Sequence, residues 1–92
     1  MTKIMLRERA EDALDCFERA RDALTKAPEN IAASQEWGIL FMIGKCHEKI
    51  AGTYDVGTEI WSLHANGALT SFQDAYKKGT ATEKSSYMKD KR

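Results

Sequence analysis

The sequence predicts an all-α fold, a three-helix antiparallel bundle built as a stack of helical hairpins. Two stretches, residues 2–26 and 58–78, carry apolar residues at steps of three and four, which is the period of an amphipathic helix. A third stretch, residues 31–51, is apolar around most of its circumference. Pro28 separates the first two stretches, and a segment bounded by glycines, residues 52–57, separates the last two.

The first predicted helix spans residues 2–26 and has one apolar stripe. The stripe consists of Leu6, Ala10, Ala13, Phe17, Ala20 and Leu24. Charged residues occupy the opposite side, so we expect one face to pack and the other to meet water. Thr2 is a suitable N-cap, and the Asp15–Arg19 pair has the favourable i,i+4 spacing. The helix is expected to end before Pro28, because the residue before a proline avoids the α region.

The second predicted helix spans residues 31–51, with Asn30 as its cap. Its apolar residues are Trp37, Ile39, Leu40, Phe41, Met42 and Ile43. These residues point in most directions around the helix, so it must be covered on more than one side and is expected to be the central helix. Gly44 lies in its interior, where glycine costs about 1 kcal/mol relative to alanine, and we expect it to permit a close backbone approach.

The third predicted helix spans residues 58–78 and is capped by Thr58 or Thr53. Its apolar side consists of Trp61, His64, Ala65, Ala68, Phe72, Ala75 and Tyr76. Residues 1–78 are therefore expected to form a single helical interaction domain. Residues 79–92 are small, polar and charged, and we expect them to form a disordered basic tail.

Composition and charge limit the number of domains and the classes of partner that we expect. A chain of 92 residues accommodates one domain, and its formal net charge of zero favours neither a nucleic-acid partner nor a membrane surface. The charge is uneven: residues 77–92 hold six basic and two acidic residues, which is typical of a solubilising end or, alternatively, of an adaptor for an acidic partner. The sequence shows no apolar run of the ~20 residues that span a bilayer. With Cys16 and Cys46 expected as buried thiols, we expect an intracellular protein, cytoplasmic or nuclear.

Two octets resemble a known repeat. Residues 13–20 and 68–75 share Ala, Leu, Phe and Ala at equivalent places, and a proline, Pro28, follows the first octet. This small–large–small pattern resembles the second helix of a tetratricopeptide repeat, and Gly44 resembles the glycine of a following first helix. The octets are 55 residues apart, whereas the family repeats every 34. The resemblance implies a helical scaffold or adaptor that binds proteins.

A second, fainter resemblance is to the helical-repeat scaffold subunit of a histone chaperone complex. It rests on Glu36-Trp37, on residues 41–45 (Phe-Met-Ile-Gly-Lys) and on Glu48-Lys49. This resemblance implies the alternative that the chain is a small structural subunit of a large assembly.

Motifs for catalysis or metal binding are weak, and no cofactor is expected. Residues 38–46 imitate a phosphate loop, but the spacing is too long and Cys46 replaces the Ser or Thr. Cys16, Cys46, His47 and His64 form no metal-ligand spacing, and neighbours such as Cys46 and His47 diverge by about 100° on a helix. A thiol nucleophile with Cys46 and His64 lacks a basic group to stabilise the thiolate. A small metal- or thiol-dependent enzyme is therefore the least favoured alternative, and we expect a non-enzyme.

The predicted function is protein binding. Three helices cannot fully cover the apolar belt of the central helix, so the chain is expected either to bind a helix or peptide of a partner or to self-associate as a homo-oligomer or complex subunit. Tryptophan and other large apolar residues are enriched at binding hot spots. The residues predicted to contact a partner are Trp37, Phe41, Met42, Tyr54 and Trp61.

Overall fold

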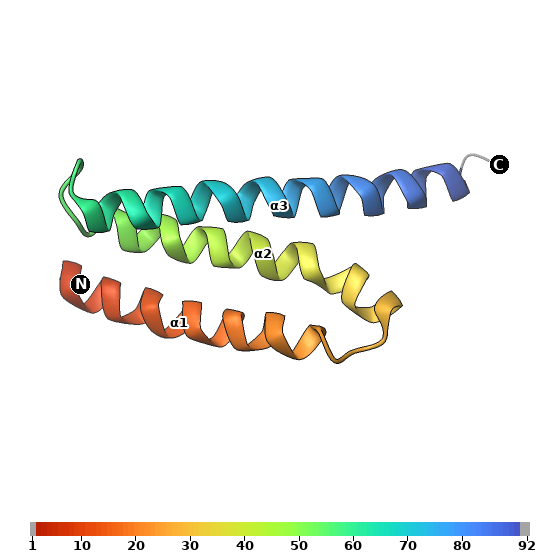
Figure 1. Cartoon of the computed structure of the whole chain (residues 1–92), viewed down its shortest axis with the longest axis horizontal. Coiled ribbons are helices and arrows are strands. Elements are labelled where there is room, and N and C mark those ends of the chain that lie inside the picture. The colour runs from red at the N-terminus through yellow and green to blue at the C-terminus, as the bar shows by residue number, and fades with distance from the viewer. Residues whose placement is uncertain (1, 91–92) are drawn as a thin grey trace.

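A computed structural model describes residues 2–90, with side chains for residues 2–32 and 35–79. It contains three helices, α1 (Lys3–Leu24), α2 (Glu29–Ala51) and α3 (Glu59–Asp90), and the described residues form no strand. Successive helices run in opposite directions (Figure 1). The predicted all-α, antiparallel three-helix architecture is therefore confirmed.

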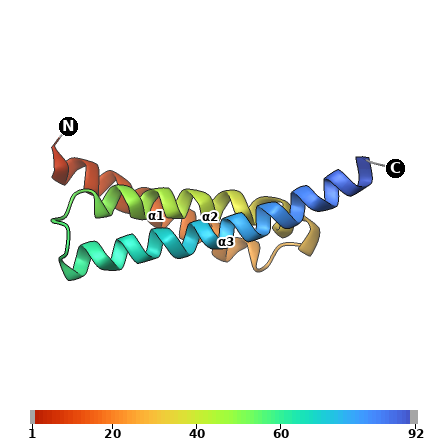
Figure 2. The ribbon, with the colours of Figure 1, turned by 90° about the horizontal axis from the view of Figure 1, so that it is seen from above.

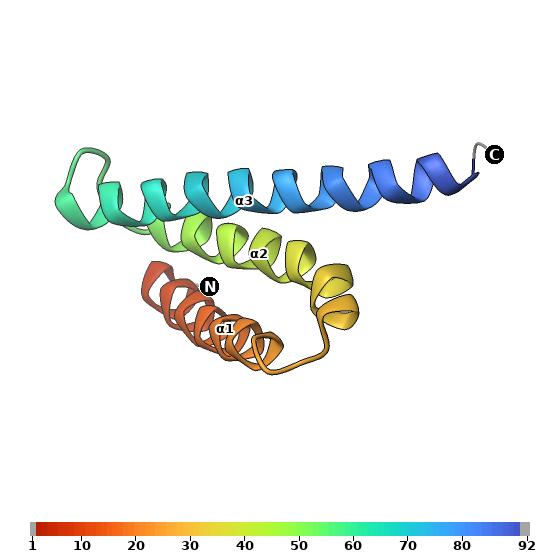
Figure 3. The same ribbon diagram turned by 45° about the vertical axis from the view of Figure 1, so that its right-hand side comes forward.

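The helices form an open layer with α2 in the middle. Both α1 and α3 pack against α2, and in the described part of the chain they do not pack against each other (Figure 3). The prediction that the second helix is central is confirmed. The 32-residue α3 sets the long dimension of the molecule, whose extents are 51 × 25 × 23 Å.

Two predicted N-caps are present. The Thr2 hydroxyl oxygen accepts a hydrogen bond from the Met5 amide at 3.1 Å, and the Thr58 hydroxyl oxygen accepts one from the Trp61 amide at 3.3 Å. Thr53 has another role, because its hydroxyl donates to the Ile50 carbonyl oxygen at 2.6 Å, at the end of α2. Side-chain oxygens of this kind satisfy backbone groups that a helix terminus leaves without an intrahelical partner.

The predicted cap of the second helix is wrong. α2 begins at Glu29, so Pro28 occupies the N-cap and Asn30 lies inside the first turn. Proline suits the start of a helix because it lacks the amide hydrogen that would be unpaired there. The first helix ends at Leu24, a little before the predicted boundary.

The predicted end of the third helix at residue 78 is also wrong. α3 continues to Asp90, and its last turns extend beyond the N-terminal end of α2 (Figure 2). After residue 78 the chain contains no proline, and the single interior Gly79 costs only about 1 kcal/mol. Residues 79–90 are thus a continuation of the helix, and the last two residues of the predicted tail lie outside the described part of the chain.

The core lies mainly between α2 and α3. Its buried residues there include Leu40, Ile43, Ile50, Ala51, Ala68 and Ala75. Gly44 permits the closest approach: a Cβ atom at this position would lie 2.7 Å from the Phe72 ring. The expected close approach at Gly44 is therefore present, and its partner is the Phe72 side chain, not a second backbone. Gly67 has a similar place on α3, where an added Cβ would lie 3.2 Å from the His47 ring.

Arg7 ties the start of α1 to the α2–α3 loop. Its Nε and one terminal nitrogen donate to the hydroxyl and carbonyl oxygens of Thr53, both at 2.9 Å. Its guanidinium carbon lies 3.8 Å from the centroid of the Tyr54 ring, a cation–π geometry. The planar guanidinium makes both kinds of contact at once. This contact fixes one end of α1 against the rest of the molecule.

Candidate functional site

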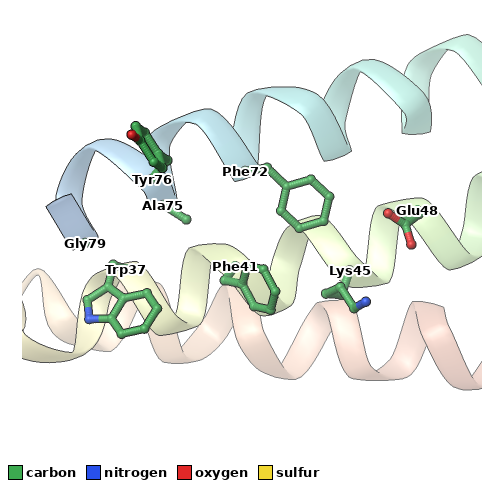
Figure 4. A pocket seen from close by; sticks show the side chains of 8 residues that line it. All are labelled: Trp37, Phe41, Lys45, Glu48, Phe72, Ala75, Tyr76 and Gly79. Carbon is green, nitrogen blue, oxygen red and sulfur yellow. The ribbon is translucent and has the colours of Figure 1, made fainter.

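An open groove lies between α2 and α3 and has a volume of about 620 Å³. Four α2 residues at steps of four, four and three provide one wall, and an α3 stripe provides the other. We call this site the aromatic groove; its lining residues are Trp37, Phe41, Lys45, Glu48, Phe72, Ala75, Tyr76 and Gly79. Residues at these steps share one face of a helix, so each wall is continuous (Figure 4).

Because α2 and α3 are antiparallel, the residues of the two walls of the aromatic groove face each other in opposite sequence order. The rings of Phe41 and Phe72 are tilted by 52° with their centroids 5.5 Å apart, which is a favourable aromatic geometry. One turn further, Trp37 lies against Gly79, where an added Cβ would be 3.6 Å from the indole ring. The small residue therefore lets the indole lie close to the α3 backbone.

Much of the aromatic surface in this groove is open to solvent. Trp37 is 42% exposed, Phe41 is 44% exposed and Tyr76 is 75% exposed. Single exposed apolar residues are common on protein surfaces, but a contiguous group of large aromatic side chains marks an interaction site. The groove is therefore the best candidate for a functional site in the described part of the chain.

Charged residues flank both ends of the aromatic groove. Lys45 and Glu48 lie together at the end away from Trp37 (Figure 4). Near the Trp37 end, the Lys78 ammonium forms an ion pair with Glu36 at 2.9 Å. Partly exposed pairs of this kind contribute little stability.

A second, smaller groove of about 280 Å³ lies between α1 and α2. Its lining includes Leu6, Ala10, Ala13, Phe17, Met42 and Cys46. Lys45 lines both grooves, so the two adjoin along α2. The apolar residues of all three helices thus contribute to two neighbouring concave sites on α2.

The structure brings together two of the five predicted partner-binding residues. Trp37 and Phe41 line the aromatic groove, whereas Met42 lies in the α1–α2 groove. Tyr54 is half-buried in the loop between α2 and α3, where it packs on Arg7 and His64, and Trp61 is half-buried near the start of α3. Neither lines the aromatic groove.

The prediction omitted the α3 wall of the groove. Phe72, Tyr76 and Gly79 follow one another at steps of four and three, a spacing visible in the sequence. Phe72 and Tyr76 were assigned to the apolar side of the third helix and not to a site, because a stripe at helical spacing is common in any core. Their partial exposure depends on α1 and α3 packing on different sides of α2, which the sequence does not show.

The two histidines form a pair between α2 and α3. Their Nδ1 atoms lie 3.0 Å apart, and the Tyr54 ring stacks on His64 with centroids 6.4 Å apart. Burial lowers the pKa of His47 and the positive charge of protonated His64 lowers it further, while Glu18 on α1 acts in the opposite direction. These causes favour the neutral imidazole of His47, so one ring donates an N–H to the other.

The cysteines differ in environment. Cys46 is buried in the α1–α2 groove, and this burial raises the pKa of its thiol, which disfavours the nucleophilic thiolate. His64 belongs to α3 and contacts His47 of α2. Cys16 is exposed, so its predicted burial is wrong. The reason is that α1 packs on α2 alone, and Cys16 lies outside the apolar stripe that lines the α1–α2 groove.

Among the described residues no group of three or more His, Cys, Asp or Glu side chains is placed to hold a metal ion. In the same part of the chain, no helix combines the length and apolar character required to cross a bilayer.

Comparisons of the chain with protein-family models, with curated proteins and with solved structures give no significant match.

Proposed function

We propose that the protein is an interaction module, a helical adaptor that binds an α-helix of a protein partner in the aromatic groove. The observation that carries this proposal is the pair of facing stripes on α2 and α3, whose aromatic side chains are 42% to 75% exposed at Trp37, Phe41 and Tyr76. A groove between two antiparallel helices accepts a third helix through apolar residues at i, i+3 or i+4, and i+7.

The chemistry of the groove supports a protein ligand. Its centre is aromatic and its charged residues lie at the rim, an arrangement typical of protein interfaces. Trp37 is the expected hot spot, because tryptophan combines a large apolar area with an indole N–H that can donate to the partner. Phe41 and Phe72 form the floor beside it.

The proposal includes a distant relationship to tetratricopeptide repeats. Phe17 and Phe72 are the large residues of the two similar octets. Phe17 lines the α1–α2 groove and Phe72 lines the α2–α3 groove, so both pack towards the central helix. This equivalent placement supports an origin of α1 and α3 as similar repeat helices.

A nuclear magnetic resonance titration tests the proposed function. Helical peptides selected from a display library against the full chain are added to the isotope-labelled protein. The chain has two tryptophans, so the Trp61 indole N–H serves as an internal control for the Trp37 indole N–H. We expect the Trp37 signal to shift and the Trp61 signal to stay. Selection of no helical binder, or binding that moves Trp61 alone, would overturn the proposal.

Two matched variants strengthen this test. Tyr76→Glu adds a charge to the groove at a residue that is 75% exposed, so it does not disturb the core. Leu63→Glu adds the same charge to α3 at a residue that is 64% exposed and lies outside the aromatic groove. We expect Tyr76→Glu to weaken peptide binding by about tenfold or more and Leu63→Glu to leave it unchanged.

A further inference from the structure

We propose that the groove between α1 and α2 binds a single-chain fatty acid, with the aliphatic chain on its apolar floor and the carboxylate at its basic end. This site is separate from the aromatic groove, so the inference goes beyond the proposed function. Its volume of about 280 Å³ lies at the lower limit of the ~300–1,000 Å³ typical of small-molecule sites. A whole helix, about 10 Å in diameter, exceeds this space, whereas one narrow chain fits it.

The floor of the α1–α2 groove is apolar and only partly covered. Two small residues of α1, Ala10 and Ala13, leave the space, and larger apolar side chains surround it. Leu6 is 39% exposed and Met42 is 40% exposed, so apolar area in this groove remains in contact with water. A hydrocarbon chain that covers this area is favoured by the hydrophobic effect.

Three basic residues line the groove, and no acidic residue of the described part of the chain does. Arg9 belongs to α1, and Lys45 and Lys49 lie one turn apart on α2. In the same part of the chain none of the three forms an ion pair. Residues 29–76 hold six acidic residues, and these two lysines are their only Lys or Arg residues. Like charges at this spacing repel each other, so a bound anion stabilises the pair.

The groove has an apolar end and a basic end. Because α1 and α2 are antiparallel (Figure 1), Phe17 lies at the same end as Met42, and Arg9 lies at the same end as Lys49. The two ends are about 10 Å apart along α2, at 1.5 Å per residue. An extended chain of about nine or ten carbons, with bonds of ~1.5 Å, spans this distance. An amphiphile with one terminal carboxylate therefore matches both the order and the length of the groove.

An extended acidic peptide matches this groove less well. Its amide groups would lie over the apolar floor, where the backbone groups of both helices are already paired with each other, and an unpaired amide in such a place costs free energy. A fatty acid carries its only polar group at one end. There the cationic side chains can donate charge-assisted hydrogen bonds to the carboxylate, which are stronger than bonds between neutral groups.

Isothermal titration calorimetry of the full chain with decanoate, kept below its micelle concentration, tests the site. We expect saturable binding that becomes about threefold tighter with each added methylene from hexanoate to decanoate. Decyltrimethylammonium has the same alkyl chain and the opposite charge, and we expect it to bind at least about tenfold more weakly.

Three variants locate the binding. Lys49→Glu reverses a charge at the basic end and is expected to weaken decanoate binding by about tenfold or more. Lys26→Glu makes the same change at an exposed residue outside both grooves and is expected to leave binding unchanged. Ala13→Leu fills the groove without changing the charge and is expected to abolish binding. Circular dichroism checks that each variant is folded.

Decanoate is also added to the isotope-labelled protein, where we expect the Met42 methyl signal to shift and the Trp37 indole signal to stay. Three results would overturn the site: decanoate that binds no tighter than decyltrimethylammonium, decanoate that shifts Trp37 and not Met42, and decanoate binding that Lys49→Glu does not weaken. Binding to vesicles of anionic phospholipid without binding of free decanoate would also overturn it and would indicate a membrane surface. None of these results affects the test of the aromatic groove with helical peptides.

Discussion

The Nδ1 atoms of His47 on α2 and His64 on α3 lie 3.0 Å apart. Only one of two facing imidazole nitrogens can carry a hydrogen if they are to bond, so the contact requires at least one neutral ring. Tyr54 stacks on His64, and Arg7 lies over the Tyr54 ring, so the pair belongs to a chain of ring contacts that reaches α1. Protonation of both rings would therefore set two positive charges against each other at this contact between α2 and α3.

The first prediction concerns pH. The pKa of His47 in the folded protein is lowered, first by burial and then by His64, below the value of 6.5 that it has when unfolded. Below about pH 6.5 the unfolded state therefore binds more protons, and the free energy of unfolding falls as the pH decreases until it passes the folded pKa. Urea unfolding at several values between about pH 7.5 and pH 5.5 measures this decrease.

A His47→Gln variant provides the control for the pH measurement. Glutamine retains a polar side chain but does not titrate, so the part of the decrease caused by His47 is expected to disappear. The negative charge of Glu18 on α1 raises the pKa of His47 and so opposes the effect of burial, which limits the size of the decrease. If the variant loses stability with decreasing pH as steeply as the wild type, His47 is not the titrating group.

The second prediction compares two glycines of the same helix. A Cβ at Gly44 would lie 2.7 Å from the Phe72 ring, whereas a Cβ at Gly38 meets nothing within 4 Å. We expect Gly44→Ala to lower the free energy of unfolding by about 1–3 kcal/mol, because Phe72 must move. We expect Gly38→Ala to raise it by up to about 1 kcal/mol, because alanine favours the helix. Urea unfolding of both variants is the measurement, and a shift in the same direction would contradict the described α2–α3 packing.

The third prediction concerns Arg7. Replacing it with lysine keeps the charge but removes the paired hydrogen bonds to Thr53 and the flat contact with Tyr54. We expect Arg7→Lys to lower the free energy of unfolding by about 1–2 kcal/mol. The matched change Arg19→Lys affects an exposed pair with Asp15 and is expected to cost less than about 0.5 kcal/mol. Equal effects of the two substitutions would show that Arg7 does not anchor α1.

The sequence was sufficient to predict the main features of the fold. The apolar stripe around Phe17 and the broad apolar belt of residues 37–43 predicted an outer helix and a central helix. Thr2 and Thr58 were recognised as caps because a hydroxyl before a periodic segment is a local signal. Asn30 is the exception among these local features, because Pro28 occupies the N-cap of α2.

Features that depend on weak or distant interactions were missed. The end of α3 was placed at residue 78 because Gly79 and the polar residues after it have low apolar content, although none of them prevents a helix. In the candidate site, Trp37 and Phe41 were predicted because they belong to the belt of α2. Tyr54 and Trp61 were included on residue type alone, and their positions depend on contacts between helices that no local pattern determines.

The most direct test of the central claim is the solvent accessibility of Trp37 when a helical partner is added. A Trp61→Phe variant leaves Trp37 as the single tryptophan, and acrylamide quenching of its fluorescence is measured while a selected helical peptide without tryptophan is added. We expect strong quenching in the free protein, where the indole is 42% exposed, and a marked loss of quenching as the peptide fills the aromatic groove. Quenching that stays unchanged at saturating peptide would contradict the claim that this groove is the contact site.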